Sequence, residues 1–312
     1  MPTIAVVGSI ITDLAVLTPR LPARGENILA YRLKIGPGGK GANAAVAAAR
    51  LGARSILIGR IGDDYFGREE LAALRAEGVN TDAVSIDLEV QTGAAVVMVD
   101  DEGENTILVI IGANDRLTPE HVEAGLAPHW DHLDAVLINF EVPPAAVAAA
   151  VNAAHAHGVP AIVDAGPPRA FGPEIWGRAT VISPNALEAA ALVGHPVEDE
   201  AAAEAAAREL LNGGPQAVVL KRGAAGALLV TREGAQHIPA FRVNVVDTTG
   251  AGDAFSGALV VALAEGKPLP EAVRFANAAG ALAVTRVGTL PAMPTRAEVE
   301  AFLASQRVSE EP

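Results

Sequence analysis

The sequence has no cysteine, few aromatic residues and a deficit of positive charge. Without cysteine the chain can form no disulfide, no thiolate metal site and no cysteine nucleophile. Its 23 lysines and arginines face 37 aspartates and glutamates, which gives a formal net charge of -14. Nucleic acid and anionic membranes require a basic binding face, so neither is expected as a partner. A small anionic ligand remains compatible, because a few oriented backbone amides can bind a phosphate.

Long uncharged apolar runs are also missing, since none approaches the ~20 residues of a membrane-spanning helix. The apolar segment at residues 3–17 is interrupted by Asp13 and lacks the basic flank of a signal peptide. With 312 residues the chain can bury a full hydrophobic core without disulfides. These features predict a soluble protein located in the cytoplasm.

Short β-branched runs alternate with longer segments rich in Ala, Leu and Glu, which is typical of a parallel sheet with crossover helices. The predicted strands cover residues 4–7, 55–58, 135–138, 161–164, 181–182 and 217–221. The predicted helices cover residues 42–51, 66–77, 119–126, 144–157, 186–193, 199–212, 252–264, 270–284 and 295–306. The fold class is therefore α/β.

Two regions interrupt this alternation, because strand-like pieces follow one another without a helix between them. The stretch "TGAAVVMVDDEGENTILVIIG" indicates a hairpin whose turn is Asp101 to Glu104. A hairpin does not easily join a parallel core, so we expect a small sheet beside the main one, formed by residues of about 12–35 and 92–112. Such a sheet can serve as a lid. We expect it to be part of a single domain of residues 1–312.

The stretch "IGPGGKGANAAVAAARLGA", residues 35–53, places Lys40 among glycines at the start of a helix, in a chain with few lysines. A phosphate-binding Walker loop would need glycine at Lys34 and a hydroxyl at Gly41, so that motif is absent. The dinucleotide pattern G-x-G-x-x-G is met by Gly36, Gly38 and Gly41, but it comes after a better first strand that ends at Gly8. An NAD-binding Rossmann oxidoreductase stays open on this pattern alone. A tight helix-capping turn explains the glycines, but not the lysine within it.

A second glycine-rich stretch, "VVDTTGAGDAFSGALVVAL", spans residues 245–263. Its small residues allow the amides of Gly250, Ala251 and Gly252 to converge at a helix start as an anion hole. Asp253 follows directly, and an aspartate at the start of a helix can serve as a helix cap, as a base, or as both. An anion hole beside a carboxylate is what in-line phosphoryl transfer requires, and the two roles are compatible.

The stretches "GGKGAN" and "DTTGAGDAFSGAL" resemble the two signatures of the PfkB/ribokinase family of carbohydrate and nucleoside kinases. The likeness extends through "VVGSIITD", "GRIGDDYFG", "GANDRLT" and "SPNALEA" to "RFANAAGALAVTRVGTLPAMP". It implies the family's three-layer fold, with a mainly parallel central sheet flanked by helices and a small β-sheet lid. It also implies an ATP-dependent sugar kinase, with the 5-hydroxyl of D-ribose as the expected acceptor. 2-Deoxyribose, another sugar or a nucleoside are alternatives, and a non-catalytic sugar-binding relative stays open.

By this resemblance, Asp253 is the base that deprotonates the sugar hydroxyl, and the amides of residues 250–252 stabilise the transferred phosphoryl group. The sugar is expected to contact Asp13, Gly38, Gly39, Lys40, Asn43, Glu141 and Asp253. Without the resemblance, Asp13 and Glu141 would be taken for solvated carboxylates at strand ends. The residues expected to contact ATP are Asn185, Lys221, Gly223, Gly226, Gly252 and Asn277.

The resemblance further implies Mg²⁺, held through water by Asn185 and Glu188, although N-x-x-E is also a helix-capping pattern. An activating K⁺ would be bound mostly by backbone carbonyls of Asp247, Thr249, Ala283, Arg286 and Gly288. A family position that often carries serine is Ala292 here. The family also implies a homodimer formed through the lid.

One position of the sugar site departs from the family pattern. Ile11 stands two residues before Asp13, where bacterial ribokinases commonly have asparagine. An isoleucine cannot form a hydrogen bond with a ring hydroxyl, and burying that hydroxyl against it costs desolvation energy. We therefore expect weaker discrimination against 2-deoxyribose than an asparagine would give.

Overall fold

The computed structural model describes residues 1–308, and within them the main sheet has nine strands in the order β13-β12-β11-β10-β9-β8-β1-β4-β5. Neighbouring strands are parallel from β11 to β5, whereas β12 and β13 are antiparallel. The strands are β1 (Thr3–Val7), β4 (Arg54–Gly62), β5 (Val84–Asp87), β8 (Ala135–Asn139), β9 (Ala161–Asp164), β10 (Val181–Ser183), β11 (Ala217–Lys221), β12 (Ala227–Thr231) and β13 (Gly234–Ile238).

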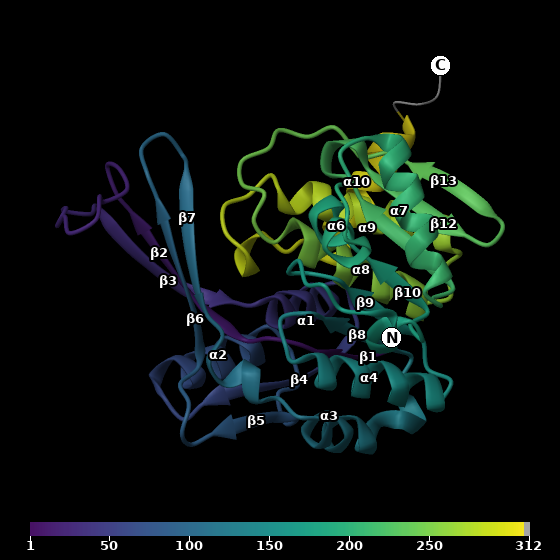
Figure 1. The fold of residues 1–312 in the computed structure, drawn as a ribbon, viewed down its shortest axis with the longest axis horizontal. Coiled ribbons are helices and arrows are strands. Elements are labelled where there is room, and N and C mark those ends of the chain that lie inside the picture. The colour runs from purple at the N-terminus through teal and green to yellow at the C-terminus, as the bar shows by residue number, and fades with distance from the viewer. Residues whose placement is uncertain (309–312) are drawn as a thin grey trace.

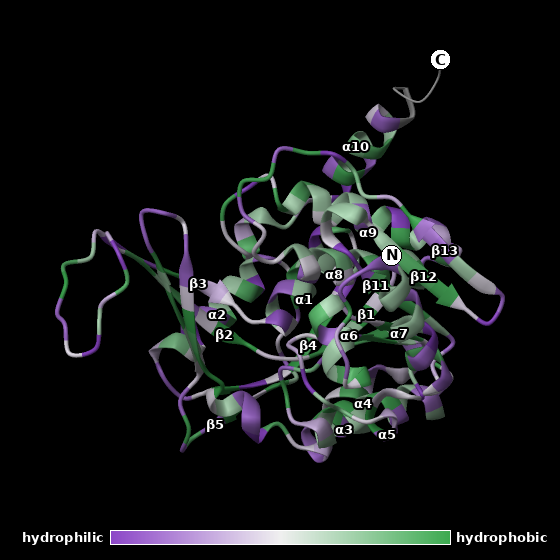
Figure 2. Cartoon of the chain, turned by 45° about the horizontal axis from the view of Figure 1, so that its top comes forward, coloured by the Kyte–Doolittle hydropathy of each residue, from purple (hydrophilic) through white to green (hydrophobic). Residues whose placement is uncertain are grey.

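Helices cover both faces of this sheet, as expected for parallel strands joined by crossovers (Figure 1). The helices are α1 (Lys40–Arg50), α2 (Tyr65–Ala76), α3 (Pro119–Leu126), α4 (Pro144–Ala156), α5 (Pro173–Trp176), α6 (Ala186–Val193), α7 (Glu200–Asn212), α8 (Ala251–Ala264), α9 (Leu269–Ala283) and α10 (Arg296–Val308). The alternating side chains of β1 show the two cores: Ile4 and Val6 pack with α1, α8 and α9, and Ala5 and Val7 pack with α3 and α4. Figure 2 shows hydrophobic residues along the buried strand β12 and helix α4.

A separate sheet of order β3-β2-β6-β7 stands beside this three-layer body, at the left in Figure 1. Its strands are β2 (Ile11–Leu17), β3 (Arg32–Gly38), β6 (Gly93–Val99) and β7 (Asn105–Ile110). β2 runs antiparallel to β3 and parallel to β6, and β6 and β7 form the expected hairpin. The predicted fold class is confirmed, whereas the action of this small sheet as a lid and the single domain, which includes residues 309–312 outside the described part, remain predictions.

The predicted strands and helices of the main body are all present, with boundaries that differ by a few residues. The prediction omits β5, the β12–β13 hairpin and the short helix α5. The hairpin breaks the βα alternation on which the prediction rests, because β12 returns beside β11 without a crossover helix. Among the helices of residues 1–308, none combines the length and apolar character needed to cross a membrane.

The dinucleotide pattern does not lie where a Rossmann fold would need it. Gly36 and Gly38 belong to β3, an antiparallel strand of the small sheet, where they pair with Asp13 and Ile11. The turn that follows the central strand β1 begins at Gly8 and leads directly into β2. The pyrophosphate-binding geometry between a first strand and its helix is therefore not formed by these glycines.

Candidate active site

The predicted site residues converge at the carboxyl ends of the central strands, where ligands of open α/β sheets bind. β8 leads to Glu141, β1 leads through Ser9 to β2, and the helices α1 and α8 begin at the same edge. The backbone of α1 approaches the end of β1 closely, because a β-carbon at Gly41 would lie 2.5 Å from the carbonyl carbon of Gly8. Gly39, with φ of 88°, makes the turn before the helix.

Asp253 lies in the first turn of α8 and is 5% exposed. Its Oδ2 accepts a hydrogen bond of 2.8 Å from the Asn43 side-chain amide, and its Oδ1 lies 3.6 Å from the Lys40 ammonium group. Burial raises the pKa of Asp253, while the Lys40 charge and the Asn43 amide oppose this shift. In turn, Asp253 raises the pKa of Lys40, which therefore remains protonated. A carboxylate with a raised pKa is suited to accept a proton near neutral pH.

The other predicted sugar residues surround this pair. Glu141 accepts hydrogen bonds from the Ser9 hydroxyl at 2.5 Å and from the backbone amide of Lys40 at 3.1 Å. Asp13 lies over Gly38, where a β-carbon would come within 2.3 Å of its carboxylate. Burial and the charges of Glu141 and Asp253 raise the pKa of Asp13 to about 6. The structure thus brings all the predicted sugar residues into one cluster of carboxylates around a lysine.

The amide groups at the start of α8 are only partly engaged. Gly250, with φ of 76°, is the N-cap residue, and no side chain caps the helix. The amide of Ala251 donates to the Thr248 carbonyl at 3.3 Å, whereas the amides of Gly250 and Gly252 have no hydrogen-bond partner within residues 1–308. A β-carbon at Gly252 would lie 3.9 Å from the Lys221 ammonium group. The helix start therefore offers free amides and a nearby cation to an anion.

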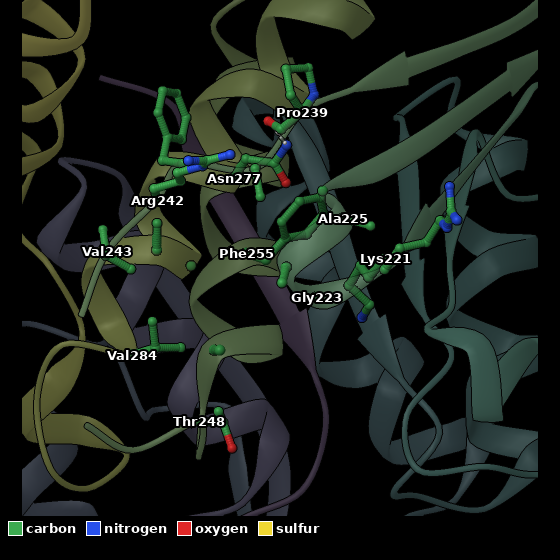
Figure 3. Close-up of a pocket in the computed structure, with 18 of the residues that line it drawn as sticks. Lys221, Gly223, Ala225, Pro239, Arg242, Val243, Thr248, Phe255, Asn277 and Val284 are labelled. Carbon is green, nitrogen blue, oxygen red and sulfur yellow. Dashed lines mark hydrogen bonds between the residues drawn. The ribbon is translucent and has the colours of Figure 1, made fainter. Parts of the chain in front are cut away.

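A cavity of about 990 Å³ opens next to this helix start (Figure 3). It is lined by five of the six residues predicted to contact ATP: Lys221, Gly223, Gly226, Gly252 and Asn277. The Asn277 side-chain amide donates to the carbonyls of Ile238 and Pro239 at 3.2 and 3.0 Å, which fixes its orientation. Phe255 and Val284 contribute apolar wall to the cavity. An elongated ligand with an apolar base and an anionic end would match these surroundings.

Asn185 lies outside that cavity and lines a second one of about 390 Å³, which shares Lys221 and Gly223 with the first. Asn185 and Glu188 form a complete capping box at the start of α6, with hydrogen bonds of 2.7 and 2.9 Å between each backbone amide and the other's side chain. The capping interpretation of N-x-x-E is therefore confirmed. Glu188 Oε2 also lies 3.8 Å from the Lys221 ammonium group.

Asp164, at the end of β9, belongs to the site although the sequence analysis does not select it. Its carboxylate accepts hydrogen bonds from the Lys221 ammonium group at 2.9 Å and the Ser256 hydroxyl at 2.6 Å. Burial alone would raise the pKa of Asp164, but the charges of Lys221 and Lys40 outweigh burial and lower it. Its position at a strand's carboxyl end is the signal that could have indicated it. Ser9 and Ser256 carry no comparable signal.

The residues expected around K⁺ lie in two segments, one just before α8 and one at the end of α9. The Asp247 carboxylate accepts from the amides of Thr249 and Gly288, each at 2.9 Å. The amides of Val246 and Asp247 donate to the Val284 carbonyl, which follows Ala283 at the end of α9. The Arg286 guanidinium group pairs with Glu298, so only its backbone is left for this loop. Ala292 is fully buried.

A buried carboxylate beside an ammonium group, free helix amides and an adjoining cavity are the parts that phosphoryl transfer between two substrates requires. Residues 1–296 match the pfkB family of carbohydrate kinases, and the chain belongs to this family. This result excludes the oxidoreductase alternative.

Three similar proteins illustrate the relationship. The chain is 40% identical over 304 residues to a ribokinase of Bacillus subtilis, covering 97% of this chain and 100% of the relative. It is 34% identical over 302 residues to a deoxyribokinase of Salmonella typhi, covering 96% and 98%. The structure of Arabidopsis thaliana ribokinase complexed with ribose and ATP superposes with a TM-score of 0.88 at 34% identity, covering 97% of this chain and 98% of that one.

Proposed function

We propose that this protein transfers the γ-phosphoryl group of ATP to the 5-hydroxyl of D-ribose. The observation that carries the proposal is the position of Asp253, which lies between the carboxylate cluster of Asp13 and Glu141 and the cavity beside α8. The similarity to ribokinases over nearly the whole chain, one of them described with ribose and ATP, supports this choice of substrates.

On the acceptor side, Asp13, Glu141 and the backbone at Gly38 and Gly39 would bind the sugar hydroxyls, which both donate and accept hydrogen bonds. Asp253 would take the proton of the attacking hydroxyl. Lys40 opposes the rise in the pKa of Asp253 and so favours its ionised form, and Asn43 fixes its orientation. A positioned base of this kind contributes a factor of about 10² to 10⁴ to the rate.

On the donor side, the cavity would hold the nucleoside of ATP, with Asn277, Gly223 and Gly226 in its wall. The phosphates would extend toward Lys221 and the start of α8. There the free amides of Gly250 and Gly252 would stabilise the negative charge of the transferred group. The amide of Ala251 would join them only if its long hydrogen bond to Thr248 opened.

Asn185 and Glu188 fit Mg²⁺ held through water, as the resemblance implies. Both oxygens of Glu188 accept hydrogen bonds from Asn185 and each keeps a free lone pair, through which a bridging water can bind. Their oxygen donors are of the type that Mg²⁺ prefers, and the ion when bound would neutralise phosphate charge. Asp247, Thr249, Ala283, Arg286 and Gly288 would hold K⁺ through backbone carbonyls, as the resemblance implies. The Arg286 side chain is turned to Glu298, so it places no positive charge against the ion.

We also propose a cytoplasmic homodimer that forms through the small sheet. On the face of that sheet opposite Asp13, the side chains of Leu33, Ile35 and Leu108 are each more than half exposed. Exposed apolar rows on a β-sheet are typical of protein interfaces.

A second candidate acceptor is 2-deoxyribose. Ile11 is 2% exposed and lies two residues before Asp13 on the same face of β2, so an apolar side chain stands beside the predicted sugar residues. One of the relatives described above is a deoxyribokinase, which is in keeping with this candidate.

The proposal is tested by measuring ADP release with a panel of pentoses, hexoses and nucleosides, with and without Mg²⁺ and K⁺. We expect D-ribose to give the highest kcat/KM. Asp253→Ala should lower kcat by a factor of about 10² to 10⁴ while ATP still binds. Near-normal turnover by Asp253→Ala would disprove the role of Asp253 as base. A sugar with a kcat/KM about tenfold above that of ribose would show that ribose is not the preferred acceptor.

A further inference from the structure

Glu70 is a buried acid that the proposed mechanism does not use. It lies on α2, which sits at the base of the small sheet (Figure 1), and it is 2% exposed. The other charged residues of this helix, Arg68, Glu69 and Arg75, are exposed. Burial of an isolated carboxyl group is costly, and a residue that only needed to fill space there could be apolar.

The two oxygens of Glu70 have different surroundings. Oε1 accepts a hydrogen bond of 2.7 Å from the hydroxyl of Thr12, which is itself buried. Oε2 is buried and makes no well-formed hydrogen bond among residues 1–308, although the backbone amide of Gly38 lies close enough to the carboxyl group to favour its charged form. A protonated carboxyl group leaves one unsatisfied oxygen at this place, whereas a carboxylate leaves a buried charge, which costs much more.

Thr12 connects Glu70 to the proposed sugar site. Thr12 and Asp13 are consecutive in β2, so their side chains point to opposite faces of the small sheet. In the neighbouring strand β3, Pro37 pairs with Thr12, and Gly38 follows it beneath the Asp13 carboxylate. Glu70 thus contacts β2 on the face of the small sheet opposite to the one that carries Asp13 and Gly38.

The charges around Glu70 favour its neutral form. Burial and the negative charge of Asp13 raise the pKa of Glu70 to about 8, while the Thr12 hydroxyl and the Gly38 amide oppose this shift. The other charged side chains on the strands that pack against α2 are Arg32, Lys34, Arg54 and Arg60. The first three are exposed, and Arg60 is paired with Asp87. Within residues 1–308 no cation therefore compensates an ionised Glu70.

We propose that Glu70 is a positioning residue for the sugar: in its neutral form it keeps β2 and β3 seated on α2 with Asp13 in place, and its ionisation weakens sugar binding. This inference rests on the proposed sugar site at Asp13 and Gly38, and it adds a pH dependence that neither Lys40 nor Asp13 would produce. Lys40 titrates at higher pH, and Asp13 titrates at lower pH.

The test is a pH profile of the wild type, Glu70→Gln and the matched surface control Glu69→Gln, using the sugar with the highest kcat/KM in the panel. For wild type and control we expect the sugar KM to rise about tenfold between about pH 7 and pH 9, with kcat changed less than about twofold. Glu70→Gln retains an acceptor for Thr12 and cannot ionise, so its KM should stay flat. Thr12→Val removes the hydrogen bond that lowers the pKa of Glu70, so the rise in KM should move to higher pH.

A wild-type KM that is flat over this range, or a rise that persists unchanged in Glu70→Gln, would overturn the inference. If Glu70→Gln does not fold, an unshifted profile of Thr12→Val overturns it equally. Thermal unfolding of each variant at both pH values separates positioning from stability, because a stability effect with an unchanged KM profile also contradicts the proposal. If ribose is not a substrate, the proposed reaction is refuted. The pH profiles of the wild type and the variants can still be compared, because they use whichever sugar of the panel has the highest kcat/KM.

Discussion

At the scale of single residues, the site is built on pairs of a lysine and a buried aspartate. Lys40 faces Asp253 on the proposed sugar side, and Lys221 faces Asp164 on the proposed nucleotide side. Asp164 is held in addition by the Ser256 hydroxyl from α8. A buried pair is stable only while both partners are present, because removing one leaves an uncompensated charge. Asp164 is therefore expected to be essential for the position of Lys221.

We expect Asp164→Asn to lower the free energy of unfolding by about 3 kcal/mol, because it leaves the buried Lys221 without its closest carboxylate. The KM for ATP should rise more than the KM for the sugar. Adding Lys221→Met should recover part of the stability without restoring ATP binding. Urea unfolding and steady-state kinetics measure these effects, with Glu204→Gln in the exposed Arg208 pair as a control. Unchanged unfolding of Asp164→Asn would contradict the role given to this pair.

Ile11→Asn tests the sugar preference at a single position. If the isoleucine permits 2-deoxyribose, the asparagine should raise the ratio of kcat/KM for ribose over 2-deoxyribose by about tenfold, since one hydrogen bond to a buried hydroxyl is worth about 1 kcal/mol or more. The measurement is kcat/KM for ribose and for 2-deoxyribose in both the wild type and the variant. A ratio that stays the same in both would refute the idea.

At the scale of elements, the close approach of α1 to the end of β1 places Lys40 and Asn43 against α8. Gly41 permits this approach, because a β-carbon there would meet the backbone of Gly8 and Ser9 at 2.5 to 2.7 Å. Gly257 performs the same role between α8 and α1, where a β-carbon would lie 2.6 Å from that of Ala47. The helix starts that carry the site are thus set by small residues at the crossings.

Gly41→Ala should displace α1 from β1 and with it Lys40 and Asn43. We expect a loss of stability of about 1 to 3 kcal/mol and a fall in kcat/KM for the sugar of more than about tenfold. Gly36→Ala is the matched control, because a β-carbon at Gly36 meets nothing within 4 Å and its backbone needs no positive φ. Thermal unfolding and kcat/KM for the sugar are measured for both variants and compared with the wild type. Equal effects of both substitutions would show that the crossing is not the cause.

At the scale of the whole molecule, the small sheet has one face toward the proposed sugar residues and an apolar face away from them. β3 and β7 are its edge strands, and the side chains of β7 are exposed along its whole length. Edge strands with exposed apolar side chains associate unless they are protected. A second copy of the chain would cover this face and hold the sheet that carries Asp13.

Leu108→Glu should therefore weaken the proposed dimer, since it places a charge on the exposed apolar face. Light scattering over a range of protein concentrations should show dimers for the wild type and monomers for the variant at low concentration. Ile86→Glu, at an exposed position on β5 of the main sheet, is the control. A monomeric wild type at all concentrations would refute the dimer.

The fold and the two glycine-rich loops of the candidate site follow from local features of the sequence, whereas Asp13 and Glu141 were indicated only by the family resemblance. The βα alternation predicts the main sheet, the uninterrupted strand pieces predict the small one, and the loops at Gly38 to Asn43 and Gly250 to Asp253 predict both sides of the reaction. Such patterns are readable because helix and strand periodicity, glycine turns and helix starts each depend on a few neighbouring residues. The β12–β13 hairpin is missed because its pairing follows no such alternation.

By itself, the sequence determined the class of fold, the two glycine loops and the residue types available for phosphoryl transfer. Only the tertiary structure decided which of these residues meet and in what charge state. Asn43 and Asp253 are 210 residues apart, Asp164 and Ser256 are 92 apart, and Thr12 and Glu70 are 58 apart. The raised pKa values of Asp13 and Glu70 arise from burial and from carboxylates brought together by folding. Burial and long-range pairing are properties of the packed chain, and no local pattern encodes them.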